Sequence, residues 1–127
     1  MIELYFFPSP NGLKVAIMLE ECGLPYEVHT VNIGRGEQFR PDYLALNPNN
    51  KIPTIVDRDR GISVFESGAI LIYLSEKSGQ FLPTGLQERS RVITWLFWQV
   101  SGLGPMAGQA HHFRAFAPET VPYGIKR

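Results

Sequence analysis

A proline stands directly before a strand-like run in Asn50-Lys51-Ile52-Pro53-Thr54-Ile55, and this segment constrains the fold more than any other. Proline has no N–H and a fixed φ, so it does not interrupt a sheet without a specific role. Because an X-Pro bond loses most of the usual preference for trans, we expect a cis Ile52-Pro53 bond in a tight turn. A cis bond would leave the N–H and C=O of Ile52 unpaired and facing outward, where they could dock the backbone of a short peptide.

A second motif, Phe65-Glu66-Ser67-Gly68-Ala69-Ile70, predicts a strand end followed at once by a helix start. The Ser67 hydroxyl and the first N–H groups of that helix suit a ligand's carboxylate, and Glu66 suits its ammonium group. The simpler alternative is an ordinary helix cap, because serine is among the preferred capping residues. Together the two motifs suggest a site for a small zwitterionic peptide.

The remaining segments supply the elements of an α/β domain. Strand patterns are expected at residues 2–7, 26–31, 54–56 and 62–65, and helical patterns at 13–22, 38–46 and 67–77. The first helical segment is almost wholly apolar, which predicts a buried helix, and in the second Phe39 and Tyr43 are expected to face inward. The order βαβ-α-ββα predicts a mixed sheet covered by helices.

The element order, the Ile52-Pro53 turn and the Glu66-Ser67 helix start resemble the thioredoxin-like N-terminal domain of cytosolic glutathione S-transferases. The resemblance covers Met1 to about Phe81 and continues into the first helix of the family's all-helical C-terminal domain. Within the family, the sequence is most similar to the bacterial Nu class. The members of that class are glutathione-dependent disulfide-bond reductases, related to the yeast nitrogen-regulator prion protein. Three segments carry that likeness: Ser9-Pro10-Asn11-Gly12, Asn49-Asn50-Lys51-Ile52-Pro53 and Trp95-Leu96-Phe97-Trp98-Gln99.

A turn-rich segment, residues 78–85, links two helical patterns and predicts a domain boundary. We expect a thioredoxin-like glutathione-binding domain over residues 1–81. Residues 82–127 would be a linker and the incomplete N-terminal part of the helical domain. We therefore expect a chain that is truncated relative to the family, which puts turnover by this chain in question.

The part after the boundary has its own pattern. A helix is expected from Gln87 to about Val100, and Gly102, Gly104 and Pro105 should bend or break it. Pro122 is placed where a further helix would begin. The apolar residues around Trp95 and Trp98 favour self-association as a homodimer.

Composition limits the other classes of function. Twelve basic and twelve acidic residues give a net charge of zero, so nucleic acid and membrane are not expected partners. No apolar run approaches the ~20 residues needed to span a bilayer. The single cysteine, Cys22, has no CxxC partner and is interpreted as a buried structural thiol of a cytoplasmic protein. His111 and His112 are adjacent and would diverge on a helix, so no metal site is expected.

The expected chemistry is the stabilisation of a glutathione thiolate. The resemblance places Asn11 and Ser9 at the catalytic position, where an amide N–H and a hydroxyl can donate to the anion at a helix N-terminus. Several classes of the family use a tyrosine hydroxyl on the first strand instead. The matching position here is Phe6, and Tyr5 would point to the opposite face, so Tyr5 is interpreted as a packing residue.

The remaining site residues complete a glutathione site. Gln38 and Lys51 are candidates for the ligand's glycyl carboxylate or peptide groups, although such residues are as often simply solvated. With Ile52, Pro53, Glu66 and Ser67 they form the expected glutathione-binding set. Asn49 and Asn50 are expected to shape the turn, because asparagine tolerates left-handed backbone.

The function that follows is glutathione-dependent disulfide reduction, in which glutathione is a co-substrate and no metal takes part. A disulfide would be the second substrate. A conjugating glutathione transferase, which attacks an electrophilic small molecule, needs the same thiolate and is the first alternative. A glutathione-binding or regulatory fragment without turnover is the second.

Overall fold

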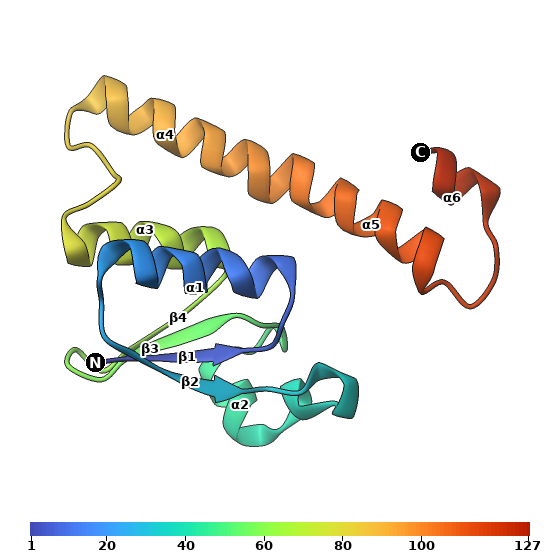
Figure 1. Cartoon of the computed structure of the whole chain (residues 1–127), viewed down its shortest axis with the longest axis horizontal. Coiled ribbons are helices and arrows are strands. Elements are labelled where there is room, and N and C mark those ends of the chain that lie inside the picture. The colour runs from blue at the N-terminus through green and yellow to red at the C-terminus, as the bar shows by residue number, and fades with distance from the viewer. The chain divides into compact units, whose positions relative to one another are not determined.

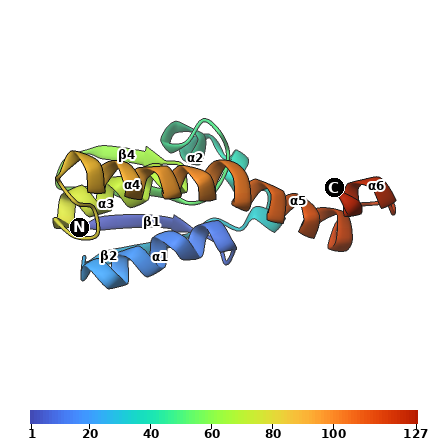
Figure 2. The same ribbon diagram turned by 90° about the horizontal axis from the view of Figure 1, so that it is seen from above.

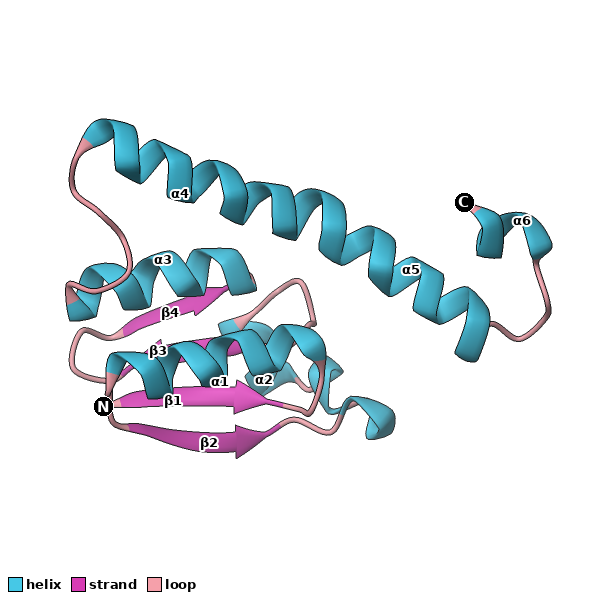
Figure 3. Cartoon of the chain, turned by 45° about the horizontal axis from the view of Figure 1, so that its top comes forward, coloured by secondary structure: helices cyan, strands magenta, loops and turns pink.

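Four strands form one mixed sheet in the computed structural model, which describes residues 1–127. They are β1 (Ile2–Phe6), β2 (Tyr26–Thr30), β3 (Thr54–Asp57) and β4 (Ile62–Phe65), in the spatial order β2-β1-β3-β4 (Figure 3). β1 runs parallel to β2, and β3 runs antiparallel to both β1 and β4. The expected thioredoxin-like α/β architecture is confirmed.

Two helices, α1 (Pro10–Cys22) and α3 (Ser67–Ser78), lie side by side on one face of the sheet (Figure 1). Alternate strand residues point to that face and form the core with one stripe of each helix. The buried core consists of Ile2, Leu4, Val15, Leu19, Ile55, Ile70 and Leu74. The helix α1, expected to be buried, is buried along one face only, because Leu13 and Ile17 on its other face are exposed.

The first helix begins earlier than its apolar pattern predicts. Ser9 is its N-cap, and Pro10 occupies the first turn, where a missing N–H costs nothing. At the other end Gly23 adopts φ +64°, a left-handed conformation that closes the helix. The polar residues at its start therefore belong to the helix itself.

The helix expected over residues 38–46 is two separate pieces. A short 3-10 turn covers Glu37–Phe39, and α2 (Pro41–Leu46) follows on the opposite face of the sheet from α1 (Figure 1). Pro41 forces extended backbone on Arg40, whose ψ is 140°, so no continuous helix can pass through it. As a result Phe39 is exposed, contrary to expectation, while Tyr43 is buried as expected.

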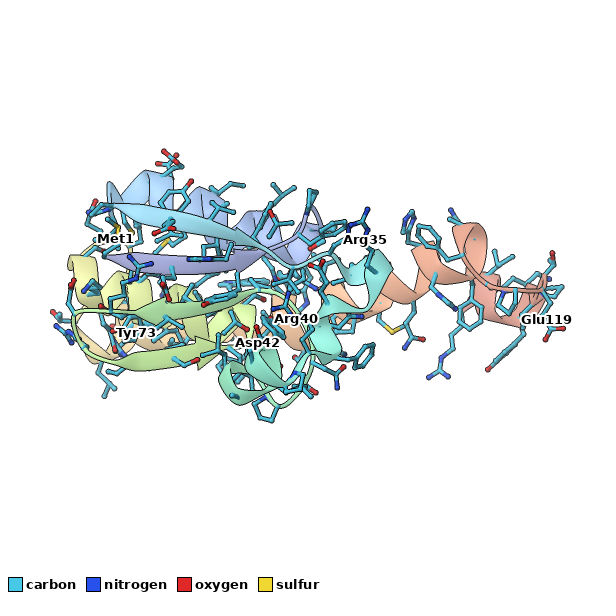
Figure 4. All side chains as sticks on the ribbon, turned by 90° about the horizontal axis from the view of Figure 1, so that it is seen from below. Met1, Arg35, Arg40, Asp42, Tyr73 and Glu119 are labelled. Atoms are coloured by element: carbon cyan, nitrogen blue, oxygen red, sulfur yellow. The ribbon has the colours of Figure 1, made fainter.

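An ion pair holds the start of α2. Arg40 donates from Nη2 to Asp42 Oδ2 at 2.7 Å, and the two labelled side chains lie next to each other in Figure 4. The hydrogen bond from Arg40 lowers the pKa of Asp42. Both groups are exposed, so solvent screens their contribution to stability.

A buried carboxylate links β3 to α3. Asp57 is fully buried and accepts hydrogen bonds from Tyr73 Oη and Lys77 Nζ, each at 2.7 Å. Burial by itself would raise the pKa of Asp57, but the bonds from Lys77 and Tyr73 outweigh it and lower the pKa to about 2. Burial and the Asp57 carboxylate raise the pKa of Tyr73 to about 12. The Asp57 carboxylate is therefore charged and paired inside the fold.

The chain divides into two units, Met1–Leu82 and Pro83–Arg127. The second consists of α4 (Leu86–Trp98), a π-helical segment Gln99–Leu103, α5 (Gly104–Ala115) and α6 (Pro122–Lys126). α6 begins at Pro122, as expected. Trp95 and Trp98 share a helix face, with their ring centroids 5.5 Å apart.

The irregularity expected at Gly102, Gly104 and Pro105 is a π-helical segment between α4 and α5, and not an end of the helical path. The ribbon runs continuously from α4 into α5 in Figure 2. Within the π-helical segment the N–H of Gly104 bonds to the carbonyl of Gln99, one residue farther back than in an α-helix. A wider turn of this kind accommodates the proline ring, which would clash with a carbonyl in a regular helix.

None of the helices combines the length and the apolar character that a membrane-spanning helix requires.

The Asp57 pairing predicts an acid dependence of stability. The folded pKa is about 2 and the ordinary value is 3.8, so the stabilisation is present above 3.8 and is lost as the pH falls toward 2. We expect this group to lower the free energy of unfolding by about 2 kcal/mol between about pH 5 and pH 2. Urea denaturation at both pH values measures it. In Asp57→Asn this component should vanish, and an unchanged acid dependence in that variant would contradict the assignment.

Candidate functional site

The register of the sheet gathers the candidate residues at one end. Tyr5 of β1 pairs with Thr54 of β3, and Thr54 pairs with Phe65 of β4. The chain after β1, before β3 and after β4 therefore leaves the sheet at the same end. β2 is parallel to β1, so it also ends there, and Gln38 follows it in the chain. This end carries Ser9, Asn11, Gln38, Lys51, Ile52, Pro53, Glu66 and Ser67.

The first component is the N-terminus of α1. The Ser9 hydroxyl accepts a hydrogen bond from the Gly12 N–H at 3.1 Å, so its own proton is left to donate elsewhere. Asn11 lies in the first turn with its side chain exposed. This turn contains no acidic residue, and the helix terminus keeps its partial positive charge.

Gly12 lets this terminus approach the end of β1. A Cβ at Gly12 would lie 2.8 Å from the carbonyl oxygen of Phe7 and 2.9 Å from the ring of Phe6. The first of these neighbours is backbone and cannot move aside easily. The close approach therefore requires glycine.

The second component is the segment before β3. The Ile52-Pro53 bond is cis, as expected, and Pro53 is buried. Neither the N–H nor the C=O of Ile52 has a hydrogen-bond partner within the chain. The backbone of Ile52 thus has a donor and an acceptor available for a ligand.

The third component is the start of α3. Glu66 is the N-cap and adopts φ +70°, a conformation that a residue with a side chain rarely takes. Ser67 is the first residue of the helix, not its cap, and no side chain caps the terminus. The simple capping alternative for Ser67 is therefore wrong. The free N–H groups of α3 and the buried Ser67 hydroxyl are available to an anion.

Two asparagines connect the second and third components. Asn50 adopts φ +50°, which agrees with its expected role in the turn. Asn49 donates from Nδ2 to Glu66 Oε1 at 3.3 Å and so helps to orient that carboxylate. Asn49 also donates its backbone N–H to Asn47 Oδ1 at 2.9 Å. The turn and the carboxylate are thereby held to one another.

The side chains of Gln38 and Lys51 form no hydrogen bond or ion pair with the other candidates, although both residues lie at the same end of the sheet. The side chain of Lys51 is exposed, and it is the residue's carbonyl oxygen that is bound inside the fold. Gln38 is half-buried, and its amide oxygen is buried without a hydrogen-bond partner. An unpaired buried amide oxygen is costly, so a partner from a ligand would be favourable.

The sequence did not reveal the residues that hold the Lys51 carbonyl. Tyr43 Oη and Asn47 Nδ2 donate to it at 2.5 and 2.8 Å. Both side chains are buried. A helix-terminal asparagine predicts only a turn, so the sequence contains no clear sign of this role.

Lys14 is a further charged residue near the site that sequence reasoning missed. Burial lowers the pKa of Lys14, and the negative charge of Glu66 opposes that shift. The two groups are therefore close enough to interact. Lys14 lies one turn after Asn11 on the same helix, a spacing of three residues that could have drawn attention to it.

Tyr5 lies on the other face of the sheet, as expected. Its ring stacks on His29 with centroids 4.9 Å apart, and both help to line a cavity of about 280 Å³ between the sheet and α2. Burial, followed by the negative charge of Glu3, raises the pKa of Tyr5. The Tyr5 hydroxyl therefore stays protonated at neutral pH. No group of three or more His, Cys, Asp or Glu side chains is placed to hold a metal ion.

This fold and this arrangement match a known family. The glutathione S-transferase N-terminal domain model matches residues 8–77. The chain belongs to the glutathione S-transferase family. It is 56% identical over 132 residues to the disulfide-bond oxidoreductase YfcG of Escherichia coli, a match that covers 100% of this chain and 61% of YfcG.

Solved structures agree with the family. A glutathione transferase family member from Pseudomonas fluorescens, with two glutathione molecules bound, superposes with a TM-score of 0.94 at 47% identity. A glutathione transferase from Pseudomonas putida, with one glutathione disulfide bound per subunit, gives 0.93 at 45% identity. Each match covers 99% of this chain, and 58% and 57% of the respective structures. The chain thus spans little more than half the length of these relatives.

The backbone of Glu66 predicts an unusual order of stability among variants. Glycine adopts positive φ without strain, so Glu66→Gly should be more stable than Glu66→Ala by about 1 kcal/mol. Glu21, an exposed residue within α1, is the matched control, where Gly should be less stable than Ala by a similar amount. Urea denaturation of all four variants tests this. The same order at both positions would contradict a strained Glu66.

Proposed function

We propose that this protein binds glutathione at the described end of the sheet and uses the glutathione thiolate to reduce disulfides. The observation that carries the proposal is the unpaired backbone of Ile52, at the same end of the sheet as an uncapped helix start and a carboxylate. A peptide with a backbone edge, an ammonium group and a carboxylate can satisfy all three. Glutathione has these groups and a thiol.

Each component would take one part of the ligand. Ile52 would exchange backbone hydrogen bonds with the central peptide. Glu66 would accept from the γ-glutamyl ammonium, while Ser67 and the first N–H groups of α3 would donate to its α-carboxylate. Gln38 and Lys51 would bind the glycyl end. The orphaned amide oxygen of Gln38 supports a role in accepting a hydrogen bond.

The start of α1 would stabilise the thiolate. Each unit by which the thiol pKa falls requires about 1.4 kcal/mol of preferential interaction with the anion. A charge-assisted hydrogen bond from Ser9 or Asn11, together with the helix terminus, supplies an interaction of that size. Ser9 is suited to this because its hydroxyl proton is not used in capping.

The proposed reaction is two successive thiol–disulfide exchanges. The glutathione thiolate attacks one sulfur of the substrate disulfide, the old S–S bond breaks, and the leaving thiolate takes a proton. A second glutathione then attacks the mixed disulfide and releases the other thiol with glutathione disulfide. Two glutathione molecules are oxidised and one disulfide is reduced, so electrons balance without a metal or a further oxidant.

The comparisons support this chemistry. YfcG, the relative at 56% identity, is a disulfide-bond oxidoreductase. The solved structures contain two glutathione molecules or one glutathione disulfide, which are the reactant and product of the proposed cycle. A conjugating transferase remains the alternative outcome, in which the protein would turn over an electrophilic aromatic substrate and not a disulfide.

The glutathione site predicts a defined loss of affinity in Glu66→Ala. Removing a hydrogen bond to a charged group should weaken binding by about 1.5–3 kcal/mol, or roughly 10- to 150-fold. Titration of glutathione against tryptophan fluorescence or by calorimetry measures it. Glu21→Ala removes an equal charge outside the site and should bind normally. Unchanged affinity in Glu66→Ala would show that Glu66 has only a structural role.

The mechanism predicts that the protein's own thiol is dispensable. Cys22 is buried at the far end of α1, about 20 Å from its start at 1.5 Å per residue. Cys22→Ser should therefore keep glutathione-dependent reduction of a model disulfide within about twofold, by the ordinary scatter of substitutions away from the chemistry. Asn11→Ala should lower the rate and raise the apparent thiol pKa. Loss of activity in a folded Cys22→Ser protein would instead identify a protein nucleophile.

We further infer that residues 82–127 begin the family's helical domain and that the chain forms homodimers. The support for self-association is exposed apolar surface on α4, where Trp95, Phe97 and Trp98 are each more than half exposed. Sedimentation velocity at micromolar concentration should give a dimer. A monomer at every concentration tested would refute the pairing.

A further inference from the structure

The peptide unit between Lys51 and Ile52 is held from one side only. Tyr43 Oη donates to the Lys51 carbonyl oxygen at 2.5 Å and Asn47 Nδ2 donates to it at 2.8 Å. A carbonyl oxygen has two lone pairs, so both of its acceptor sites are used. Both donors come from α2 or its end, a different element from the strand that follows.

This carbonyl and the Ile52 N–H belong to the same planar unit. In a trans peptide the N–H points opposite to the C=O, and the plane is rigid. The Ile52-Pro53 bond is the cis bond of the chain, so the Lys51-Ile52 bond is trans. Fixing the Lys51 carbonyl toward α2 therefore fixes the Ile52 N–H in the opposite direction, where it has no partner in the chain.

The two donors also belong to a buried hydrogen-bond network, although their bonds to the Lys51 carbonyl do not pass through it. Tyr43 has one hydroxyl proton and gives it to Lys51, so the Thr54 hydroxyl must donate to Tyr43 Oη, 2.9 Å away. Thr54 Oγ1 in turn accepts from Asn47 Nδ2 at 3.2 Å. Tyr43, Asn47 and Thr54 are 4%, 2% and 0% exposed. Burial raises the pKa of Tyr43, which keeps the proton that it donates.

We propose that Tyr43 and Asn47 are positioning residues that aim the Ile52 N–H at the backbone carbonyl of the bound peptide. This inference rests on the proposed function, because it names what sets the affinity of the same site. Asn47 has a second effect on the site through Oδ1, which accepts from the Asn49 N–H, while Asn49 donates to Glu66. Both side chains are buried, so they would act on the ligand through Lys51 and Asn49 and not by direct contact.

Two nearly isosteric variants remove the aiming bonds. Tyr43→Phe deletes one donor to Lys51, and Asn47→Asp deletes the other while keeping an oxygen for the Asn49 N–H. Thr54→Val is the matched control, because it removes buried hydrogen bonds from the same network but neither donor to Lys51. All three should lower the urea midpoint, so stability alone does not separate a positioning role from a structural one.

The decisive measurements are glutathione titration, steady-state kinetics and ¹⁵N relaxation of the full chain without ligand. We expect Tyr43→Phe and Asn47→Asp each to weaken glutathione binding about fivefold, the effect of one net hydrogen bond. The KM for glutathione should rise with kcat unchanged. The order parameter of the Ile52 amide should fall from a rigid value near ~0.85 in these variants. Thr54→Val should leave both affinity and the Ile52 amide near wild type.

Two results would overturn the inference. If Thr54→Val weakens binding as much as Tyr43→Phe, affinity follows stability and the network is only structural. If the Ile52 amide stays equally rigid in Tyr43→Phe and Asn47→Asp, these residues do not aim it. The relaxation measurement needs no ligand, so it decides this point even if the wild-type chain binds no glutathione, a result that would refute the proposed function separately.

Discussion

The pairing of β3 with two neighbours at once is the constraint on which the candidate site depends. β3 is antiparallel to both β1 and β4, so the start of β3 lies beside the ends of both. Ser9, Ile52 and Glu66, which are far apart in the sequence, are therefore brought to one end of the sheet. A slip of one residue in this register would turn Ile55 out of the core and carry Ile52 to the wrong face.

The same strand is fixed at its other end by a buried charge. Asp57 accepts from Tyr73 and Lys77 on α3, which binds the strand to the helix that also carries Ser67. A buried carboxylate is tolerable only when it is paired and hydrogen-bonded, and both conditions are met here. β3 thus has a polar anchor at each end, with Asp57 at one and Thr54 at the other, around the apolar residue Ile55.

The site itself is assembled from backbone groups that the fold leaves unsatisfied. The helix starts of α1 and α3 supply N–H groups, and Ile52 supplies a donor and an acceptor. Groups of this kind are costly to bury and are favourable only when a ligand or water satisfies them. Glu66 adds a strained backbone at the same place, a kind of feature that is concentrated at functional sites.

Local sequence patterns led to correct predictions of the strands, the core and the Ile52-Pro53 turn. These patterns depend only on residues that are neighbours in the chain. The candidate site was located by the motifs around Pro53 and Glu66, which resemble those of the family. The same patterns misjudged Phe39, because Pro41 splits the helix. Near Pro105 they predicted an irregular helix but not its π-helical form. They also assigned Ser67 as a possible cap where Glu66 takes that position.

What only the tertiary structure decided are the contacts between segments distant in the sequence. The hold of Tyr43 and Asn47 on Lys51, the bond from Asn49 to Glu66 and the burial of Asp57 against Lys77 all join separate elements. No pattern of neighbouring residues encodes such contacts, because a hydrogen bond depends on distance and direction in space. The sequence by itself determined the order of the elements and the candidate groups that they carry, and the packing of α2 and α3 on the sheet determined where those groups point.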